Sequence, residues 1–341
     1  MVFFDIVFTS HPTMIYKTDG KIRDDKITLD DEINEIYYYL EKTKKFLDNN
    51  GYNNIKLSSW CGGDRDGHPG VTVNITSNLM KTKYLNYDLD IRDNSRKITK
   101  LINYLFPDSI NLTKDIINYN FNEIKNVDND LINVIKIMRG GQRFIISDCE
   151  NFHHILVIYK ISKIFNLDIL IVPLFESKES LEQSLNIMEE AINNNIYDSK
   201  QIEVMLAYSD TSKTGGVIDS TFQLYISQIR LYNLGKKYNK EITFFHGRGG
   251  SFPRAGGNYL DFFNRLPNVS LNNIRFTVQG ERICHEFGDE IKISNTINEI
   301  INSYNDRLKL RNIHNYDQTI LKKAELISNI SRDIYRNFII R

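Results

Sequence analysis

Short apolar runs alternate with longer amphipathic stretches along the whole chain. The runs are rich in Val, Ile and Phe, and their lengths are typical of buried strands. They predict eight strands, at Val2–Phe8, Ile55–Trp60, Tyr87–Ile91, Arg143–Ser147, Leu167–Phe175, Glu203–Ser209, Ile242–Phe245 and Ile274–Val278.

The stretches between these runs carry apolar residues at intervals of three and four, which is the period of an amphipathic helix. Thr28 can cap the first of these helices, and Asp31 and Glu32 place negative charge in its first turn. The predicted helices are Leu29–Asn49, Phe152–Phe165, Ser180–Asn193, Ser220–Tyr238 and, at the end of the chain, roughly Asn295–Leu310 and Gln318–Phe338.

Alternation of strands and helices predicts an α/β fold with a parallel sheet and right-handed crossovers. Eight strand–helix units favour closure of this sheet into a (β/α)8 TIM-type barrel with extra helices. An open, doubly wound sheet is the alternative. We expect a single barrel domain over residues 1–341, with C-terminal helices from about residue 289 onwards.

Composition narrows the class of protein. The chain holds 43 Lys and Arg against 43 Asp and Glu, a balance that argues against a nucleic-acid binder. Three cysteines without a C-x-x-C pair argue against a disulfide framework or a cysteine-based zinc site. No apolar run approaches the length of a membrane span, and the N-terminus lacks the basic region of a signal peptide. We therefore expect a cytoplasmic protein without a membrane partner.

Clusters of Gly, His, Arg and Asp begin where the strand runs end, after seven of the eight predicted strands. The carboxyl ends of all strands share one face of a barrel, and polar residues at those ends are typical of an active site. Chance could place one or two clusters in this way, but not seven. The pattern therefore predicts an enzyme.

Arginines and glycines in these clusters indicate an anion site. Arg65, Arg92, Arg248 and Arg254 lie in loops or at strand ends, and Arg binds carboxylate or phosphate through a bidentate fork. The glycine-rich stretch 246–257 lets the backbone approach a ligand closely. It matches neither a Walker A loop nor a dinucleotide fingerprint. We expect these cations to gather at one mouth of the barrel for a small anion.

Two carboxylates are candidate metal ligands. Glu176 and Asp210 end neighbouring predicted strands, so they could share a hard divalent cation whose other ligands are water and substrate oxygens. Lys213 could add a positive charge for a phosphate. His11 stands at a strand end, where a general acid or base could act, and His246 opens the glycine-rich stretch. The residues alone predict a metal-dependent barrel enzyme that acts on a small phosphorylated or carboxylated substrate.

The chain resembles phosphoenolpyruvate carboxylase in a series of motifs that occur in the order found in that family. Together they span residues 9 to 281 and are far more specific than any one of them. They are Thr9-Ser-His-Pro-Thr13, Ser59-Trp-Cys-Gly-Gly-Asp-Arg-Asp-Gly-His-Pro-Gly-Val-Thr72, Leu89-Asp-Ile-Arg92, Val172-Pro-Leu-Phe-Glu176, Met205-Leu-Ala-Tyr-Ser-Asp-Thr-Ser-Lys213, Phe245-His-Gly-Arg-Gly-Gly250 and Gln279-Gly-Glu281.

The resemblance implies an α/β barrel that joins phosphoenolpyruvate and bicarbonate into oxaloacetate and phosphate with Mg²⁺ or Mn²⁺, by way of carboxyphosphate and the enolate of pyruvate. It implies that Glu176 and Asp210 hold the metal and that Trp60 lines the substrate pocket. Arg65 and His246 join the expected substrate-binding residues. The catalytic residues that it implies are His11 for the proton of carboxyphosphate, Arg254 for the bicarbonate-derived fragment, and Arg92, Arg248 and Lys213 for the phosphate.

The sequence also departs from the family pattern. Met14, His68, Thr214, Pro253, Ala255 and Val278 stand where other residues are usual. We expect a shortened, divergent member that lacks the C-terminal helical region, which normally supplies further arginines and an inhibitor site. Three functions remain: a minimal carboxylase, completed by its own cations or by a second subunit in a homo-oligomer or a complementing chain; a phosphoenolpyruvate-binding enzyme that uses another electrophile or releases pyruvate; and a non-catalytic barrel or partner subunit.

Overall fold

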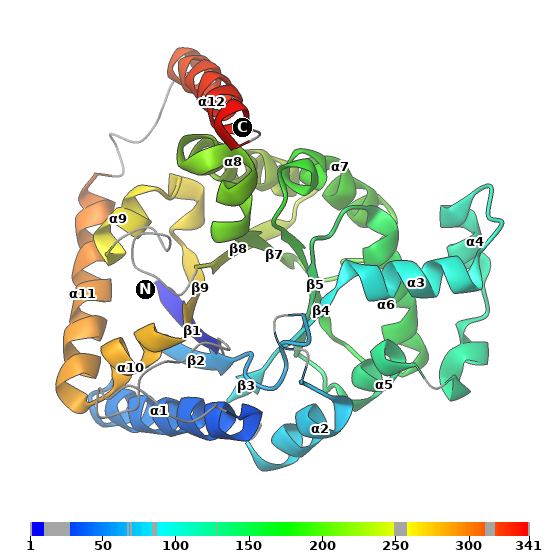
Figure 1. Ribbon diagram of the computed structural model, residues 1–341, viewed down its shortest axis with the longest axis horizontal. Coiled ribbons are helices and arrows are strands. Elements are labelled where there is room, and N and C mark those ends of the chain that lie inside the picture. The colour runs from blue at the N-terminus through cyan, green and yellow to red at the C-terminus, as the bar shows by residue number, and fades with distance from the viewer. Residues whose placement is uncertain are drawn as a thin grey trace.

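The structure is a computed structural model that describes residues 2–9, 28–66, 68, 70–83, 87–127, 129–248, 258–310 and 318–339. Within this part of the chain, parallel strands form a central ring and helices surround it (Figure 1). The strands are β1 (Phe3–Thr9), β2 (Ile55–Ser59), β3 (Asp88–Leu89), β4 (Ile91–Asn94), β5 (Arg143–Ser147), β6 (Leu170–Phe175), β7 (Gln201–Ala207), β8 (Glu241–Gly247) and β9 (Asn273–Gln279).

The sheet closes at its third strand. Its order is β3-β2-β1-β9-β8-β7-β6-β5-β4, so β3 and β4 are the two ends of the series. Only Asp90 separates β3 from β4 in the sequence, and the two segments are one interrupted strand that pairs with β2 on one side and β5 on the other. The nine segments therefore make the eight-stranded barrel that the sequence predicts.

Helices follow every strand of the barrel, as expected for βα units. No helix in the described part of the chain is long and apolar enough to cross a membrane. The helices are α1 (Leu29–Asn49), α2 (Val73–Thr82), α3 (Ser95–Leu105), α4 (Leu112–Asn118), α5 (Asp130–Ile137), α6 (Phe152–Ile164), α7 (Lys178–Asn193), α8 (Ser209–Lys237), α9 (Tyr259–Asn264), α10 (Glu281–Phe287), α11 (Glu290–Lys309) and α12 (Gln318–Ile339), with 3₁₀ turns η1 (Phe121–Asn126) and η2 (Asn268–Ser270).

Most predicted boundaries agree with these elements, and α1 is confirmed at both ends. Thr28 caps α1 through a reciprocal pair of hydrogen bonds with Asp31, as its sequence suggested. The predicted helix Ser220–Tyr238 corresponds to the second segment of α8, which follows a kink at Gly216, but the first segment, from Ser209, was not predicted. Gly216 has a φ of 78°, and a side chain there would press on the ring of Tyr335 in α12. The polar start of α8 lacks the apolar period that would have revealed it.

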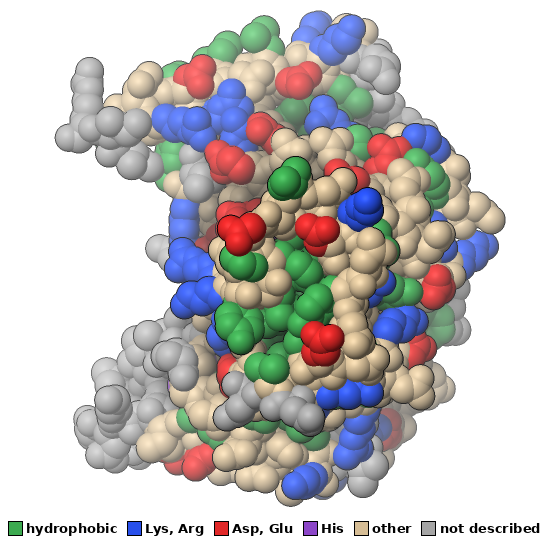
Figure 2. Space-filling view, turned by 90° about the vertical axis from the view of Figure 1, so that its right-hand side faces the viewer, with side chains coloured by type: hydrophobic (Ala, Val, Ile, Leu, Met, Phe, Trp, Pro, Cys, Tyr) green, Lys and Arg blue, Asp and Glu red, His purple; other side chains and the backbone are tan. Residues whose placement is uncertain are grey.

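The segment between β4 and β5 is the largest departure from a simple barrel. It holds α3, α4, η1 and α5, and Figure 1 shows this segment extending from the right-hand side of the ring. Apolar side chains gather on this side of the molecule, which faces the viewer in Figure 2. The exposed large apolar residues of the segment are Tyr104, Ile110 and Ile117.

The interior of the barrel is layered because side chains of a strand alternate between two faces. An apolar layer fills the middle, formed by Val7, Trp60, Ile145, Val172, Leu174, Met205, Ala207 and Phe245. Two residues earlier on their strands lie Asp5, Arg143 and Glu203. These three belong to a charged layer at the amino-terminal end of the barrel.

Arg275 of β9 is the centre of this charged layer. Its guanidinium pairs with Asp5 of β1 and with Asp90 between β3 and β4, and its Nε lies 3.8 Å from Glu203 of β7. Arg143 of β5 binds the same Glu203 carboxylate at 2.8 Å. Burial raises the pKa of Asp90 to about 6, although Arg275 opposes this shift. Charged side chains from five places around the ring thus hold one another inside the barrel.

The loop after β2 completes the pairing of the third strand. The amide of Arg92 donates to the carbonyl of Gly63 at 2.9 Å, and the amide of Arg65 donates to the carbonyl of Arg92 at 2.9 Å. This contact needs a glycine, since a Cβ at residue 63 would lie 2.1 Å from the carbonyl oxygen of Asp90. Gly63, in the loop after β2, therefore has a structural role.

We predict that Gly63→Ala lowers the free energy of unfolding by about 3 kcal/mol, because the backbone at Asp90 must move to admit the methyl group. Gly140→Ala is the matched control, since the nearest atom to a Cβ there is 3.7 Å away. Urea denaturation of both variants measures the difference. Equal stability of the two would show that the close approach to Asp90 costs little to relax.

Candidate active site

Arg92 of β4 is the centre of a polar cluster at the carboxyl end of the barrel. Its Nη2 lies 3.1 Å from Asp66 Oδ2 and 3.6 Å from Glu176 Oε2, and its Nη1 lies 3.7 Å from Asp64 Oδ2. Its Nε donates to the hydroxyl of Ser147 at 3.4 Å. One guanidinium is therefore surrounded by carboxylates from the loop after β2 and from the end of β6.

Trp60 supports this cluster from inside the barrel. The guanidinium carbon of Arg92 lies 5.3 Å from the centre of the indole, within the range of a cation–π contact. The indole packs edge-on against Phe245, with ring centres 5.3 Å apart. Trp60 thus belongs to the apolar layer and contacts Arg92 at the mouth, and its role as a wall of the substrate pocket stays a prediction.

Glu176 follows the last residue of β6 and precedes Ser177, the N-cap of α7. Its Oε1 accepts a hydrogen bond of 2.8 Å from the backbone amide of Asp148. Burial raises the pKa of Glu176 to about 7, Arg92 opposes the shift, and the charges of Asp210, Asp66 and Asp148 add to it. A further positive charge near Glu176 would stabilise its ionised form.

Asp210 and Lys213 lie in the first turns of α8. Lys213 Nζ is 2.5 Å from Asp210 Oδ1, and its side chain is 68% exposed. The charge of Asp210 acts on Arg92 as well as on Glu176, which brings the predicted pair of carboxylates into one electrostatic neighbourhood.

The donor set of this neighbourhood fits a hard divalent cation. The oxygens of Glu176 and Asp210 are the ligand type that Mg²⁺ and Mn²⁺ prefer, and the surrounding carboxylates outnumber Arg92 and Lys213. The described residues contain no group of three or more His, Cys, Asp or Glu arranged to hold a metal ion by themselves.

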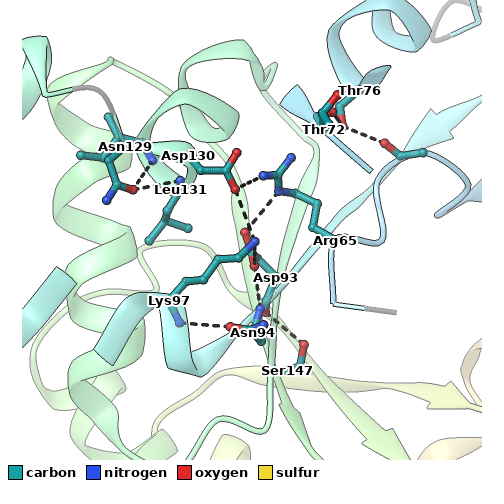
Figure 3. A network of polar contacts seen from close by, with 12 residues as sticks. Arg65, Thr72, Thr76, Asp93, Asn94, Lys97, Asn129, Asp130, Leu131 and Ser147 are labelled. Atoms are coloured by element: carbon teal, nitrogen blue, oxygen red, sulfur yellow. Dashed lines mark hydrogen bonds and ion pairs between the residues drawn. The ribbon is translucent and has the colours of Figure 1, made fainter. Parts of the chain in front are cut away.

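Arg65 is engaged away from this cluster, in the network of Figure 3. Its guanidinium pairs with Asp130 at the start of α5, and its Nε lies 3.4 Å from Asp93 Oδ2. Lys97 of α3 reaches both carboxylates, at 2.9 Å to Asp93 and 3.4 Å to Asp130. The guanidinium of Arg65 therefore fastens the loop after β2 to β4 and α5, and its ion pairs are with Asp93 and Asp130 rather than with Glu176.

The side chains of His246, in β8, and of Arg248, just after it, lie in an aromatic layer on the outer side of the barrel strands. The guanidinium of Arg248 stacks on Phe262 and Tyr259, at 4.5 and 4.8 Å from the ring centres, and burial lowers its pKa to about 10. His246 alternates with the inward-facing Phe245 and so faces outward, where its Nδ1 lies 2.8 Å from the hydroxyl of Tyr208. The structure thus separates Arg65, Arg92 and Arg248, which we expected at one mouth.

His11 and Arg254, the predicted proton carrier and bicarbonate ligand, lie outside the described residues. Their roles stay predictions.

Several residues of the cluster were not singled out from the sequence. Asp64 and Asp66 flank Arg65 in a motif whose arginine alone was assigned a role. Asp148 directly follows the strand Arg143–Ser147, the one predicted strand for which no polar cluster was noted. The expectation that polar residues at strand ends form the site also applies to Asp148 and could have identified it.

A family model described as phosphoenolpyruvate carboxylase matches the chain over residues 26–122 and 121–341. The two matches together cover every described element from α1 to α12 and all the residues of the cluster around Arg92.

We predict that Arg65→Met lowers the free energy of unfolding by about 3 kcal/mol, because it removes one of the two cations, Arg65 and Lys97, that pair with the fully buried side chain of Asp93. Arg96→Met, an exposed neighbour, is the control. Chemical denaturation gives both values. A loss confined to substrate binding, with unchanged stability, would argue against the structural role.

We predict that the stability of the protein depends on pH through the protonation of His246. Burial lowers its pKa from 6.5 to about 3, so at a pH between these values the unfolded chain binds one proton more than the folded chain. The contribution of His246 to the free energy of unfolding is fully present above pH 6.5. As the pH falls from 6.5 to 5, the free energy of unfolding decreases by about 2 kcal/mol, and it continues to decrease towards pH 3. His246→Gln should remove this part of the loss in urea denaturation at pH 7 and 5.

The exposed His285→Gln is the matched control for this experiment. A His246→Gln variant that still loses as much stability as the wild type would show that His246 is not the group responsible.

Proposed function

Because the chain belongs to the phosphoenolpyruvate carboxylase family, we propose that it joins phosphoenolpyruvate and bicarbonate to give oxaloacetate and phosphate. The observation that carries the proposal is the cluster in which Arg92 meets Glu176 at the carboxyl end of the barrel, with Asp210 beside them. This cluster offers both a cation for a phosphate and carboxylates for a metal.

Arg92 would bind the phosphate of the substrate. Its present partners, Asp64 and Asp66, lie at 3.7 and 3.1 Å, so a phosphate oxygen can compete for the same guanidinium. Trp60 beneath it keeps the guanidinium at the mouth of the barrel. Lys213 on α8 would add a second positive charge from the exposed side.

Glu176 and Asp210 would hold Mg²⁺ or Mn²⁺. The bound ion would act as a Lewis acid that stabilises negative charge on the phosphate and enolate oxygens. The surrounding protein keeps Glu176 ready for this purpose, since its carboxylate is oriented by the amide of Asp148 and by Arg92.

In the proposed reaction an oxygen of bicarbonate attacks phosphorus, and the bond from phosphorus to the enol oxygen breaks. The products of this step are carboxyphosphate and the enolate of pyruvate. His11 would take the proton of carboxyphosphate as it splits into CO₂ and phosphate, and Arg254 would orient the bicarbonate-derived fragment. The enolate carbon then attacks CO₂ to form oxaloacetate. Stabilisation of the developing charges is the main catalytic contribution.

A second candidate is an enzyme that binds phosphoenolpyruvate but releases pyruvate or uses another electrophile. The positions of Arg65 and Arg248 favour it, since Arg65 pairs with Asp93 and Asp130 and Arg248 packs into the aromatic layer. Fewer cations around the substrate would stabilise the enolate less, which favours its protonation to pyruvate over its carboxylation.

We expect the purified protein to form oxaloacetate from phosphoenolpyruvate, bicarbonate and Mg²⁺, measured by coupled reduction to malate. Glu176→Gln should lower kcat/KM by about 100-fold or more, because it removes the negative charge of one of two metal ligands. Glu182→Gln, on α7 with a half-exposed side chain, is the control and should retain activity.

Three results are informative. Bicarbonate-dependent oxaloacetate that is lost in Glu176→Gln supports the carboxylase. Pyruvate formed without oxaloacetate supports the second candidate. A folded wild type that turns over no phosphoenolpyruvate contradicts both.

A further inference from the structure

Asp148 contacts Glu176 and the residue that follows it. Its backbone amide donates a hydrogen bond of 2.8 Å to Glu176 Oε1, and its own Oδ1 accepts one of 3.0 Å from the hydroxyl of Ser177. Ser177 is the N-cap of α7, and its hydroxyl oxygen also accepts from the amide of Ser180. The end of β5 is thereby fastened to the turn in which β6 gives way to α7.

The backbone of Asp148 is in an unusual conformation for this place in the fold. Its φ is 45°, in the left-handed region that Gly, Asn and Asp adopt most readily. The other described non-glycine residues with positive φ are Asn166, Asn195 and Asn239, each of which lies two residues after the end of a helix, α6, α7 and α8 respectively. Left-handed residues commonly end helices in this way. Asp148 instead follows a strand, at the carboxyl end of the barrel, where a strained residue is typical of a functional site.

We propose that Asp148 is a positioning residue that holds the carboxylate of Glu176 in the orientation needed to bind the divalent cation. The inference rests on the proposed function in one respect, that Glu176 is a ligand of the cation. It adds a residue that touches neither the cation nor the substrate but determines where the ligand lies.

Both oxygens of Glu176 are restrained in this arrangement. Oε1 faces the amide of Asp148, and Oε2 faces Arg92 at 3.6 Å. The amide can keep its direction because the side chain of the same residue is tied to Ser177, immediately after Glu176. Groups that orient a metal ligand through hydrogen bonds typically change metal affinity by about 10- to 100-fold when they are replaced.

Replacements of Asp148 can separate its two features, the acceptor for Ser177 and the left-handed backbone. Asn keeps the acceptor for Ser177 and tolerates the left-handed backbone, so Asp148→Asn retains both features. Gly tolerates the backbone but has no acceptor. Ala lacks the acceptor and is strained at this φ. The three variants therefore separate the tie to Ser177 from backbone strain.

The test is the affinity of the full chain for Mn²⁺ alone, measured by the electron paramagnetic resonance signal of the free ion. We expect Asp148→Asn to bind within about threefold of the wild type, and both Asp148→Gly and Asp148→Ala to bind about 10-fold more weakly or worse. Glu150→Ala, an exposed residue two positions further along the same loop, is the matched control and should bind as the wild type does. Urea denaturation of each variant confirms that it is folded.

Wild-type affinity in a folded Asp148→Gly would overturn the inference, since the tie to Ser177 would then be irrelevant to the cation. Binding of Mn²⁺ by Asp148→Asn that is as weak as binding by Asp148→Gly would overturn the inference as well, because Asn retains both proposed features. The proposed function fails separately. Mn²⁺ binding that depends on Glu176 but supports no oxaloacetate would contradict the carboxylase and leave the position of Asp148 established.

Discussion

The closure of the sheet at its third strand is the constraint on which the rest of this structure depends. β3 and β4 are too short to form a stable edge, and only Asp90 joins them. The strand is held from inside by Arg275, which pairs with Asp90 and Asp5, and from outside by the loop of Gly63. Buried charges are tolerated here because each has a partner of opposite sign.

The same strand links the base of the barrel to the candidate site. Asp90 and Arg92 are two residues apart, so both side chains face the interior, one at the charged layer and the other at the mouth. Arg92 lies in β4 and Glu176 directly follows β6, and only β5 separates these two strands in the ring order, so the parallel sheet brings both residues to the same mouth. The position of the site is a consequence of the topology.

The arginines show how little net charge reveals about a site. The chain is formally neutral, and its buried guanidinium groups are distributed through the molecule. Arg275 lies at the base of the barrel, Arg65 pairs with carboxylates of β4 and α5, and Arg307 donates to the backbone carbonyls of Phe263 and Leu266. Arg92 at the mouth is surrounded by carboxylates. That excess of negative charge is what suits the candidate site to a divalent cation.

The sequence alone determined the fold class, the number of barrel strands and most helix boundaries, because apolar periodicity and strand–helix alternation are local properties. It also determined the family, through motifs in a fixed order, and placed Glu176, Asp210 and Arg92 on one face. Partners and directions were decided only by the tertiary structure. An arginine at a strand end can face the mouth, as Arg92 does, or a distant carboxylate, as Arg65 does, and that choice depends on which elements pack beside it. For the same reason Asp148 became visible only when the end of β5 met Glu176 in space.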